Sequence, residues 1–275
     1  MRVAVQHVTR LDFAGEVAES VMDVRVGPLD DAHQRTQRFQ LGWEPHGHAR
    51  RYADGFGNVA HLLTSVRTHS FLQVSVESEV ETLLKDPFAL PSEVPSPLDP
   101  LELADGLNAS RLIPLLPLLV ELAEPFGDLE PFEAVRQMSS MIHQRFEYQP
   151  GVTDVTTSVA EVVAGGRGVC QDFAHLLIGL CRALRIPARY VSGYIVAADA
   201  GGPSRGGGAS HAWAEAYTPS HGWRGFDPTN NLLANDRYIK VAVGRDYHDV
   251  PPTRGTYRGA GVGNLGVAVS TRVLQ

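Results

Sequence analysis

Three side chains in the second half of the chain could together activate a cysteine for attack. Cys170 follows a glycine-rich stretch, His211 begins the run "HAWAEAYT", and Asp227 ends the run "GWRGFD". Attack by cysteine on a carbonyl needs a thiolate, a base that generates it, and a third group that orients the base. Cys170, His211 and Asp227 could fill these three roles. We therefore take them as the candidate catalytic residues.

Strand alternation tests whether the histidine and the aspartate can meet. The pattern of "HAWAEAY" puts His211 on the same face as Trp213 and Glu215, whereas in "GWRGFD" Asp227 shares a face with Trp223. If the two strands form a hairpin closed by a three-residue loop at 218–220, His211 lies directly opposite Asp227. A two- or four-residue loop would instead place them on opposite faces.

The position of Cys170 also favours chemistry. Gly165, Gly166 and Gly168 precede it, and an apolar helix predicted at 172–185 follows. The free amide groups and positive dipole at a helix start favour a thiolate and can donate to an oxyanion. Cys181 lies deep in the apolar run, where a small core residue is expected. The two sulfurs, 11 residues apart on one helix, are separated by roughly 16 Å, so both should be free thiols.

The other polar candidates have simpler structural explanations. His175 and Glu215 are expected to be hydrogen-bonded structural groups, and Trp213 and Trp223 to be cleft walls or core. The "HGH" at 46–48 could chelate a metal, but no third ligand is near it in the sequence. The insert "GGPSRGGGAS" at 201–210 is expected to be a flexible connector, because it lacks the Lys-Ser/Thr of a phosphate-binding loop.

Composition and patterning indicate two domains. The chain has 275 residues, 43% of them apolar, which is enough to bury a full core. Period-two alternation predicts an antiparallel β-domain over 1–85, a proline-rich linker over 86–110, and a catalytic domain over 111–275. The "EPFEAVRQMSSMIHQRFEY" run predicts an amphipathic helix. The fold class expected is α+β.

Charge and targeting signals limit the partners. The net charge is −7 and the basic residues do not cluster, which argues against nucleic acid or an anionic membrane. The longest apolar stretch, 112–122, is too short to span a bilayer and contains two prolines. No export signal is visible, so we expect a cytoplasmic protein whose cysteines stay reduced.

Three stretches together resemble the bacterial transglutaminase-like family, relatives of papain-type thiol enzymes: "GRGVCQDFAHLLIGLCRALRIPARYVSGY", "SHAWAEAY" and "GWRGFDPTNN". The first half, with "DGFGN" and "VESEVE", is similar to the N-terminal domain of that family, and "VAVGRDYHDVPPTRGTYRG" to its C-terminal segment. One departure is Leu184-Arg185, where the family pattern has glycine before Ile-Pro. The resemblance implies a papain-like core, with a central helix on an antiparallel sheet. It also implies Cys170 as nucleophile, His211 as general base and acid, and Asp227 as orienting group.

The expected reaction passes through a thioester formed on an amide of a protein or peptide substrate. The family's bacterial members imply no calcium, the chain shows no acidic calcium loop, and we expect neither a cofactor nor a metal. Hydrolysis is favoured over transfer, because water is always present and nothing in the sequence marks an amine site. The alternative is a non-catalytic peptide-binding or assembly module that retains the fold. A metal site made of the same three residues is a weaker idea, because it offers only three mixed ligands.

Overall fold

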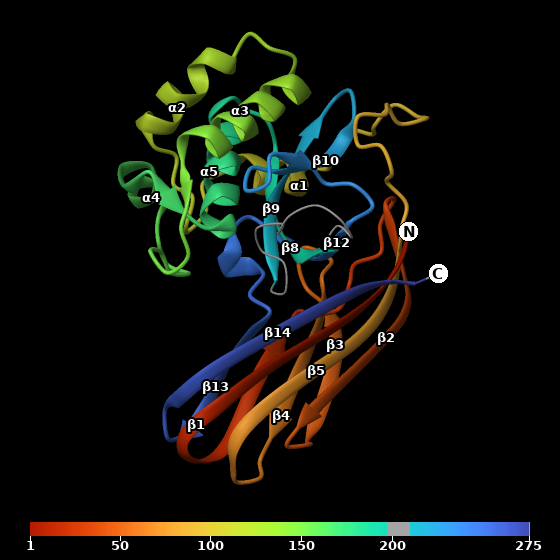
Figure 1. Ribbon diagram of the computed structural model, residues 1–275, viewed down its shortest axis with the longest axis vertical. Coiled ribbons are helices and arrows are strands. Elements are labelled where there is room, and N and C mark those ends of the chain that lie inside the picture. The colour runs from red at the N-terminus through yellow and green to blue at the C-terminus, as the bar shows by residue number, and fades with distance from the viewer. Residues whose placement is uncertain (197–209, 275) are drawn as a thin grey trace.

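The computed structural model describes residues 1–196 and 210–274. Figure 1 shows a mixed helical and sheet part above and an extended β part below, with the two termini close together. The predicted α+β class is confirmed. Nearly all of the glycine-rich insert lies outside the described residues.

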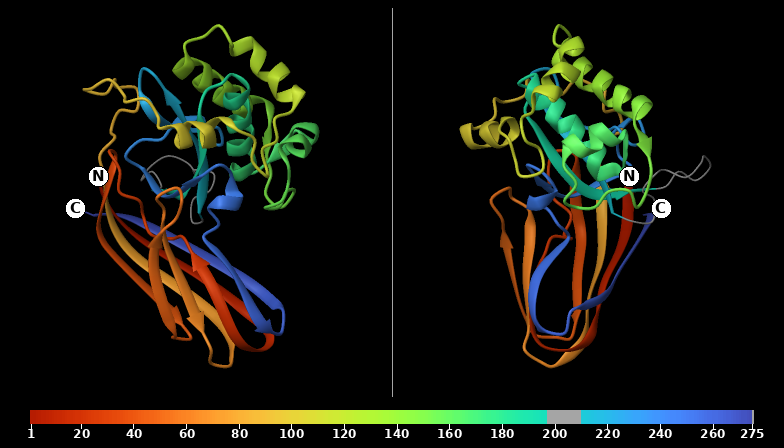
Figure 2. Two further views of the ribbon diagram at one scale, coloured as in Figure 1. Left: turned by 180° about the vertical axis from the view of Figure 1, so that it is seen from behind. Right: turned by 90° about the vertical axis from the view of Figure 1, so that its left-hand side faces the viewer.

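The N-terminal half forms one curled antiparallel sheet. Its strands are β1 (Arg2–Val24), β2 (Gln34–Glu44), β3 (His48–Ala53), β4 (Val59–Ser65) and β5 (His69–Thr82), in the spatial order β2-β5-β1-β4-β3. The first half of β1 pairs with β5 and the second half with β4, with an irregularity between Asp12 and Val17. The sheet curls, as the side view in Figure 2 shows. Its strands share an apolar core that includes Phe13, Val17 and Leu72.

The C-terminal strands return to this N-terminal sheet. The strands β13 (Thr253–Gly259) and β14 (Val262–Leu274) both pair with β1, on the side away from β4 and β5. The sequence interpretation had assigned this segment to the catalytic domain at 111–275. The sheet pairing places it with the N-terminal part instead, because β1 offers a second edge along its whole length.

The linker segment contains one helix and packs on the second part. Helix α1 (Pro100–Leu107) starts at Asp99, whose carboxylate accepts hydrogen bonds from the amides of Leu101 and Glu102. The predicted linker at 86–110 therefore includes a regular element, because an N-cap aspartate followed by proline favours a helix start. Before it, the carbonyls of Pro87 and Ala89 accept hydrogen bonds from the Arg224 side chain.

Four further helices cover the second core. They are α2 (Pro117–Ala123), α3 (Pro131–Arg145), α4 (Val159–Gly165) and α5 (Cys170–Ala183), with short 3-10 turns at Glu124–Phe126 and Tyr247–Asp249. The amphipathic helix expected from the "EPFEAV" run is α3, and its apolar face is buried. Eleven of the 14 residues of α5 are buried, so this helix is the centre of the core, as predicted.

The second sheet supports the central helix. Its strands are β8 (Ala188–Ile195), β9 (His211–Thr218), β10 (Gly222–Asp227), β11 (Leu232–Leu233) and β12 (Tyr238–Gly244), in the order β11-β10-β9-β8-β12. All of these pairs are antiparallel. The alanines of β9 face the core that contains α5. Alanine at these positions lets the helix approach the sheet closely, which fixes the distance between the start of α5 and the strands.

Two apolar clusters and several buried hydrogen bonds join the two parts. One cluster combines Val3, Val5 and Val80 of the N-terminal sheet with Tyr194, Ile239 and Val241 of the second sheet. The other includes Leu29, Val191, Trp213 and Val243. Asn58 forms two hydrogen bonds with the backbone of Val243, both 2.7 Å long. The site described below is therefore held on a frame built from both ends of the chain.

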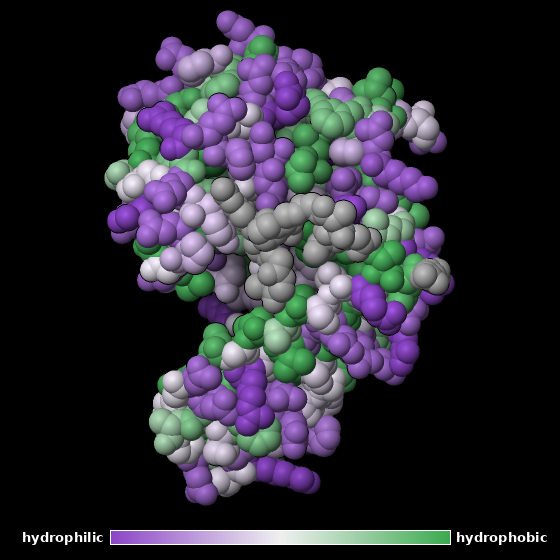
Figure 3. All heavy atoms as spheres, in the orientation of Figure 1, coloured by the Kyte–Doolittle hydropathy of each residue, from purple (hydrophilic) through white to green (hydrophobic). Residues whose placement is uncertain are grey.

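The surface gives no sign of a spanning segment. Figure 3 shows polar and charged side chains over much of this face, with apolar side chains scattered between them. Within the described residues, no helix is both long enough and apolar enough to cross a bilayer.

Candidate active site

Cys170 is the first residue of α5, at the end of a tightly held loop. Helix α4 ends in a left-handed residue, Gly166, at φ 67°, a conformation that glycine adopts without strain. The chain then forms the short strand β7 (Arg167–Gly168), which pairs in parallel with β6 (Glu147–Tyr148) from the segment before α4 and ends just before the cysteine. Because Cys170 opens the helix, its backbone amide has no acceptor inside the helix and is free to donate to a bound group.

Asp172 fixes this loop from within the first turn of α5. Its side chain is fully buried, and its Oδ2 accepts hydrogen bonds from the Val169 amide at 2.7 Å and from the Thr153 hydroxyl at 2.6 Å. A Cβ on Gly168 would lie 2.7 Å from this same oxygen, so only glycine fits there. Burial raises the pKa of Asp172, although the two hydrogen bonds act in the opposite direction. The sequence reasoning assigned no role to Asp172.

The β9–β10 hairpin brings His211 and Asp227 to one face, in a register two residues away from the predicted one. Thr218 pairs with Gly222, so the three-residue loop is 219–221 and not 218–220. Asp227 therefore lies across from Trp213, and His211 is its diagonal neighbour. The predicted shared face holds, because a shift of two residues preserves it. The direct pairing was wrong, since the loop closes one residue later on each strand.

The diagonal arrangement still joins the two side chains. His211 Nε2 lies 2.8 Å from Asp227 Oδ2, and both side chains are completely buried. Burial alone would raise the pKa of the Asp227 carboxyl, but His211 and the hydrogen bonds from Asn230 and Tyr238 lower it overall. Asp227 is thus a stable carboxylate that orients the imidazole.

The sequence reasoning missed the groups that hold Asp227. The Tyr238 hydroxyl donates to its Oδ2 at 2.9 Å, and so does the Asn230 side-chain amide at 2.8 Å. The backbone amides of Thr229 and Asn230 donate to Oδ1. The turn after "FDPTNN" is a readable signal for the amide donors, because aspartate commonly accepts from amides two and three residues ahead. Tyr238 comes from β12, and no local pattern points to it.

Cys170 is brought to the same imidazole. Burial would lower the pKa of His211, but the charge and hydrogen bond of Asp227, together with those of Cys170, raise it to about 10. Since Asp227 occupies Nε2, the other ring nitrogen, Nδ1, remains available for proton exchange. Nδ1 is buried and makes no hydrogen bond of ordinary geometry within the described part of the chain. The arrangement therefore favours an imidazolium that is held in place by the Asp227 carboxylate.

Comparison with known proteins gives the fold and site a context. Residues 120–228 match the transglutaminase-like superfamily, and residues 3–81 match the bacterial transglutaminase-like N-terminal region. An uncharacterized protein of Mycobacterium leprae is 32% identical over 274 residues, which cover 98% of this chain and 97% of that protein. An uncharacterized protein of Mycobacterium tuberculosis is 32% identical over 285 residues, covering 92% of this chain and 87% of its own.

A solved structure of similar fold spans the whole chain. It is a protein of Cytophaga hutchinsonii proposed to be a cysteine protease, with a TM-score of 0.77 and 25% sequence identity, covering 100% of this chain and 92% of its own. The chain belongs to the bacterial transglutaminase-like family. The resemblance drawn from the sequence and the expected papain-like core are both confirmed.

In this transglutaminase-like chain, Trp213 forms the wall behind the histidine. It is 1% exposed, and its ring stacks on that of His211 with centroids 6.2 Å apart. A Cβ on Gly193 would lie 2.6 Å from the Trp213 ring, and one on Gly225 would lie 3.0 Å from its Nε1. The indole therefore fills a slot between two glycines of the flanking strands. Trp223 is placed elsewhere, beneath the guanidinium of Arg189.

The remaining polar candidates have structural partners. Glu215 is buried between Lys240 and Arg189; burial would raise its pKa, but these two cations lower it to about 2. His175 accepts a hydrogen bond from the Tyr247 amide, and burial lowers its pKa to about 4. Cys181 is fully buried, and burial raises the pKa of its thiol to about 12. Among the described residues, no group of three or more His, Cys, Asp or Glu is arranged to hold a metal ion.

Proposed function

We propose that this chain is a cysteine-dependent enzyme that cleaves or transfers amide bonds of a protein or peptide substrate through a thioester, with hydrolysis favoured. Cys170 is the nucleophile, His211 the general base and acid, and Asp227 the orienting group. The observation that carries the proposal is the shared imidazole. Its Nε2 lies 2.8 Å from Asp227, and Cys170, at the start of α5, contributes with Asp227 to the raised pKa of the ring.

The first half of the reaction forms the thioester. The Cys170 thiolate attacks the amide carbon, and the negative charge moves to the carbonyl oxygen, where the Cys170 backbone amide can donate to it. The His211 imidazolium gives its proton to the amide nitrogen, the C–N bond breaks, and the amine leaves. His211 is then neutral, and the acyl group is bound to sulfur.

The second half resolves the thioester. Neutral His211 accepts a proton from water, the resulting hydroxide attacks the acyl carbon, and the carboxylic acid product leaves sulfur. The thiolate and the imidazolium are restored together, so protons balance over the cycle. If an amine replaces water, the same steps give transfer. We favour water because none of the charged groups around His211 and Asp227 that we describe above is placed as an amine site.

A product screen tests the proposal. The full chain is incubated with glutamine-containing peptides and with casein, with and without a primary amine, and the products are analysed by mass spectrometry. Cleaved peptide, or glutamate formed from glutamine, supports hydrolysis; an amine adduct supports transfer. Each product should be lost in the Cys170→Ala variant. A product that persists in that variant would rule out Cys170 as nucleophile.

Thiol reactivity tests the ion pair without a known substrate. We predict that iodoacetamide labels Cys170 at pH 6 at least about tenfold faster in the wild-type chain than in the His211→Ala variant, because the imidazolium stabilises the thiolate. Peptide mapping by mass spectrometry measures the rate. Buried Cys181 should stay unlabelled, and His48→Ala, at an exposed position in β3, is the matched control. Equal rates in wild type and His211→Ala would favour the non-catalytic peptide-binding alternative.

A further inference from the structure

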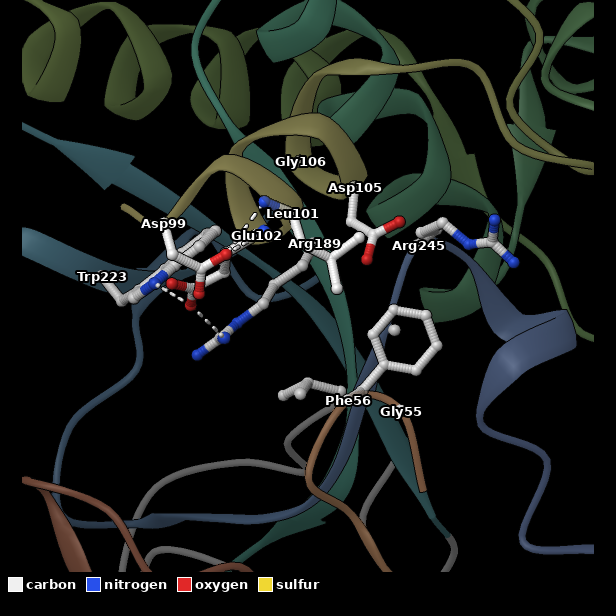
Figure 4. A pocket seen from close by; sticks show the side chains of 12 residues that line it. Gly55, Phe56, Asp99, Leu101, Glu102, Asp105, Gly106, Arg189, Trp223 and Arg245 are labelled. Carbon is white, nitrogen blue, oxygen red and sulfur yellow. Dashed lines mark hydrogen bonds and ion pairs between the residues drawn. The ribbon is translucent and has the colours of Figure 1, made fainter. Parts of the chain in front are cut away.

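A cavity lies away from the proposed catalytic residues. Its volume is about 310 Å³, the lower range for small-ligand sites. It is bounded by α1, by the ends of β8, β10 and β12, and by the turn between β3 and β4. Figure 4 shows the side chains that line it. The cavity is therefore shared between the N-terminal sheet, which supplies Gly55 and Phe56, and the catalytic part.

The two cations of this cavity are already paired. Arg189 forms an ion pair with Glu215 at 2.7 Å and lies 3.6 Å from Glu102, and its guanidinium stacks on the Trp223 ring at 4.1 Å. Arg245 is held by both oxygens of Asp249, at 2.9 Å and 3.0 Å. A bound anion would have to compete with these carboxylates. The arginines thus form walls and do not attract anions strongly.

Two of the three carboxylates are also engaged. Asp99 accepts the hydrogen bonds that begin α1, and Glu102 accepts one from the Trp223 indole at 3.1 Å. Asp105 differs, because no hydrogen bond or ion pair reaches its carboxylate from any residue that the structure describes. Its charge helps to raise the pKa of Arg245, although the hydrogen bond between Arg245 and Asp249 is the largest cause of that rise. Figure 4 shows this carboxylate pointing into the cavity, on the side of the Phe56 ring.

We propose that this cavity binds a primary alkylammonium group, with Asp105 as its counter-ion and Phe56 and Leu101 around its alkyl chain. The lining residues carry three carboxylates against two paired guanidinium groups, so the excess charge is negative. A carboxylate attracts an ammonium by charge, and the Phe56 ring, whose centroid lies 5.7 Å from the Arg245 guanidinium, offers apolar contact to the alkyl chain. The group could come from a lysine side chain of a bound polypeptide or from a free amine.

The site is separate from the proposed thioester chemistry. Arg182, near the end of α5, donates to the carbonyl of Gly106 at 3.2 Å, which places the cavity at the end of the helix opposite Cys170. A 14-residue helix is about 20 Å long, so an amine bound here does not reach an acyl group on the sulfur. Binding of an ammonium group here therefore does not depend on whether Cys170 is the nucleophile.

Calorimetric titration of the full wild-type chain with n-pentylammonium chloride tests the site. We expect binding with a dissociation constant on the order of 1 mM. Asp105→Asn should weaken it about tenfold, because the charge is lost while the shape is kept. Phe56→Leu should weaken it by a smaller factor. Asp128→Asn makes the same charge change at an exposed position outside the cavity and should leave binding unchanged. Circular dichroism checks that each variant is folded.

Three further ligands, titrated into the wild-type chain, test which chemical group the cavity binds. n-Pentanol keeps the alkyl chain without the charge and n-pentanoate reverses the charge, so both should bind more weakly than n-pentylammonium. Nα-acetyl-lysine methylamide separates the sources: binding comparable to n-pentylammonium indicates a lysine side chain, and much weaker binding indicates a free amine. No binding of either ammonium compound, equal binding of n-pentanol, or unchanged binding in Asp105→Asn would overturn the proposal.

Discussion

At the scale of single residues, the protonation state of His211 decides whether the proposed chemistry is possible. Its pKa is raised to about 10 in the folded chain, against about 6.5 in an unfolded one. The protonated ring therefore contributes stability that is fully present below pH 6.5 and is lost as the pH rises toward 10. Around neutral pH the folded protein carries an imidazolium beside Cys170.

Replacement of Asp227 tests this assignment. In Asp227→Asn we predict that the pKa of His211 falls by roughly one to three units, because the carboxylate that favours the charged ring is gone. NMR titration of histidine-labelled protein measures the shift. Asp128→Asn, which changes an exposed carboxylate, is the control. A His211 resonance that titrates near 6.5 in the wild-type chain would contradict the ion pair.

Sequence reasoning predicted that His211 and Asp227 share a face of the hairpin, but it gave only part of their geometry. Alternation placed His211 and Asp227 on one face of the hairpin. This result holds in the structure because a shift of the strand pairing by two residues leaves each side chain on the same face. The exact register depended on a loop that closes at Gly222, where φ is 67°, and alternation carries no information on that turn. Tyr238 was not found because two strands, β9 and β8, lie between its strand and that of Asp227, and only the folded sheet shows that contact.

At the scale of elements, the start of α5 is the part on which the proposed chemistry most depends. The run of apolar residues was enough to predict a buried central helix, since apolar faces all round must be covered. The same run gave no indication that Asp172, in its first turn, points back to the Val169 amide and to Thr153. That contact is tertiary, and it fixes the loop on which Cys170 is presented.

Two substitutions of Asp172 separate hydrogen bonding from charge. We predict that Asp172→Ala lowers the free energy of unfolding by about 1–3 kcal/mol, because a buried amide and a hydroxyl lose their acceptor. Asp172→Asn keeps an acceptor oxygen in the same volume. Because burial raises the pKa of the native carboxyl, its ionised form is less favoured in the folded chain than in the unfolded one, and the neutral amide should cost less than about 1 kcal/mol at pH 7. Urea unfolding measures both values.

The difference between the unfolding free energies of Asp172→Ala and Asp172→Asn shows whether the hydrogen bonds or the charge of Asp172 stabilise the chain. If Asp172→Asn destabilises the chain as much as Asp172→Ala, the contribution of Asp172 comes from its charge and not from its acceptor oxygen. Asp128→Asn, at an exposed position outside this loop, should be measured alongside to show the effect of a lost surface charge. Iodoacetamide labelling of Cys170 in the same variants then reports whether a looser loop also exposes the thiol differently.

At the scale of the whole molecule, the β-rich half and the transglutaminase-like half form one unit. The chain leaves the N-terminal sheet after β5, builds the transglutaminase-like part, and returns so that β13 and β14 pair with β1. Period-two patterning identified the β half but not this return, because strand pairing between the two ends of a chain leaves no local signal. The N-terminal sheet is therefore not a contiguous segment that can be cut out complete, because it includes strands from both ends of the chain.

This closure predicts a single cooperative unfolding transition for the wild-type chain, with Asn58 as a main link across the junction. Asn58 is fully buried, and its two hydrogen bonds satisfy both backbone groups of Val243. Asn58→Ala should lower the free energy of unfolding by about 2–4 kcal/mol, because two buried backbone groups lose their partners. Asn264→Ala, exposed on β14, should change it by less than about 0.5 kcal/mol. Calorimetry and urea unfolding followed by tryptophan fluorescence measure both effects. Two separate transitions in the wild-type chain would show that the halves unfold independently, and that the junction around Val243 does not couple them.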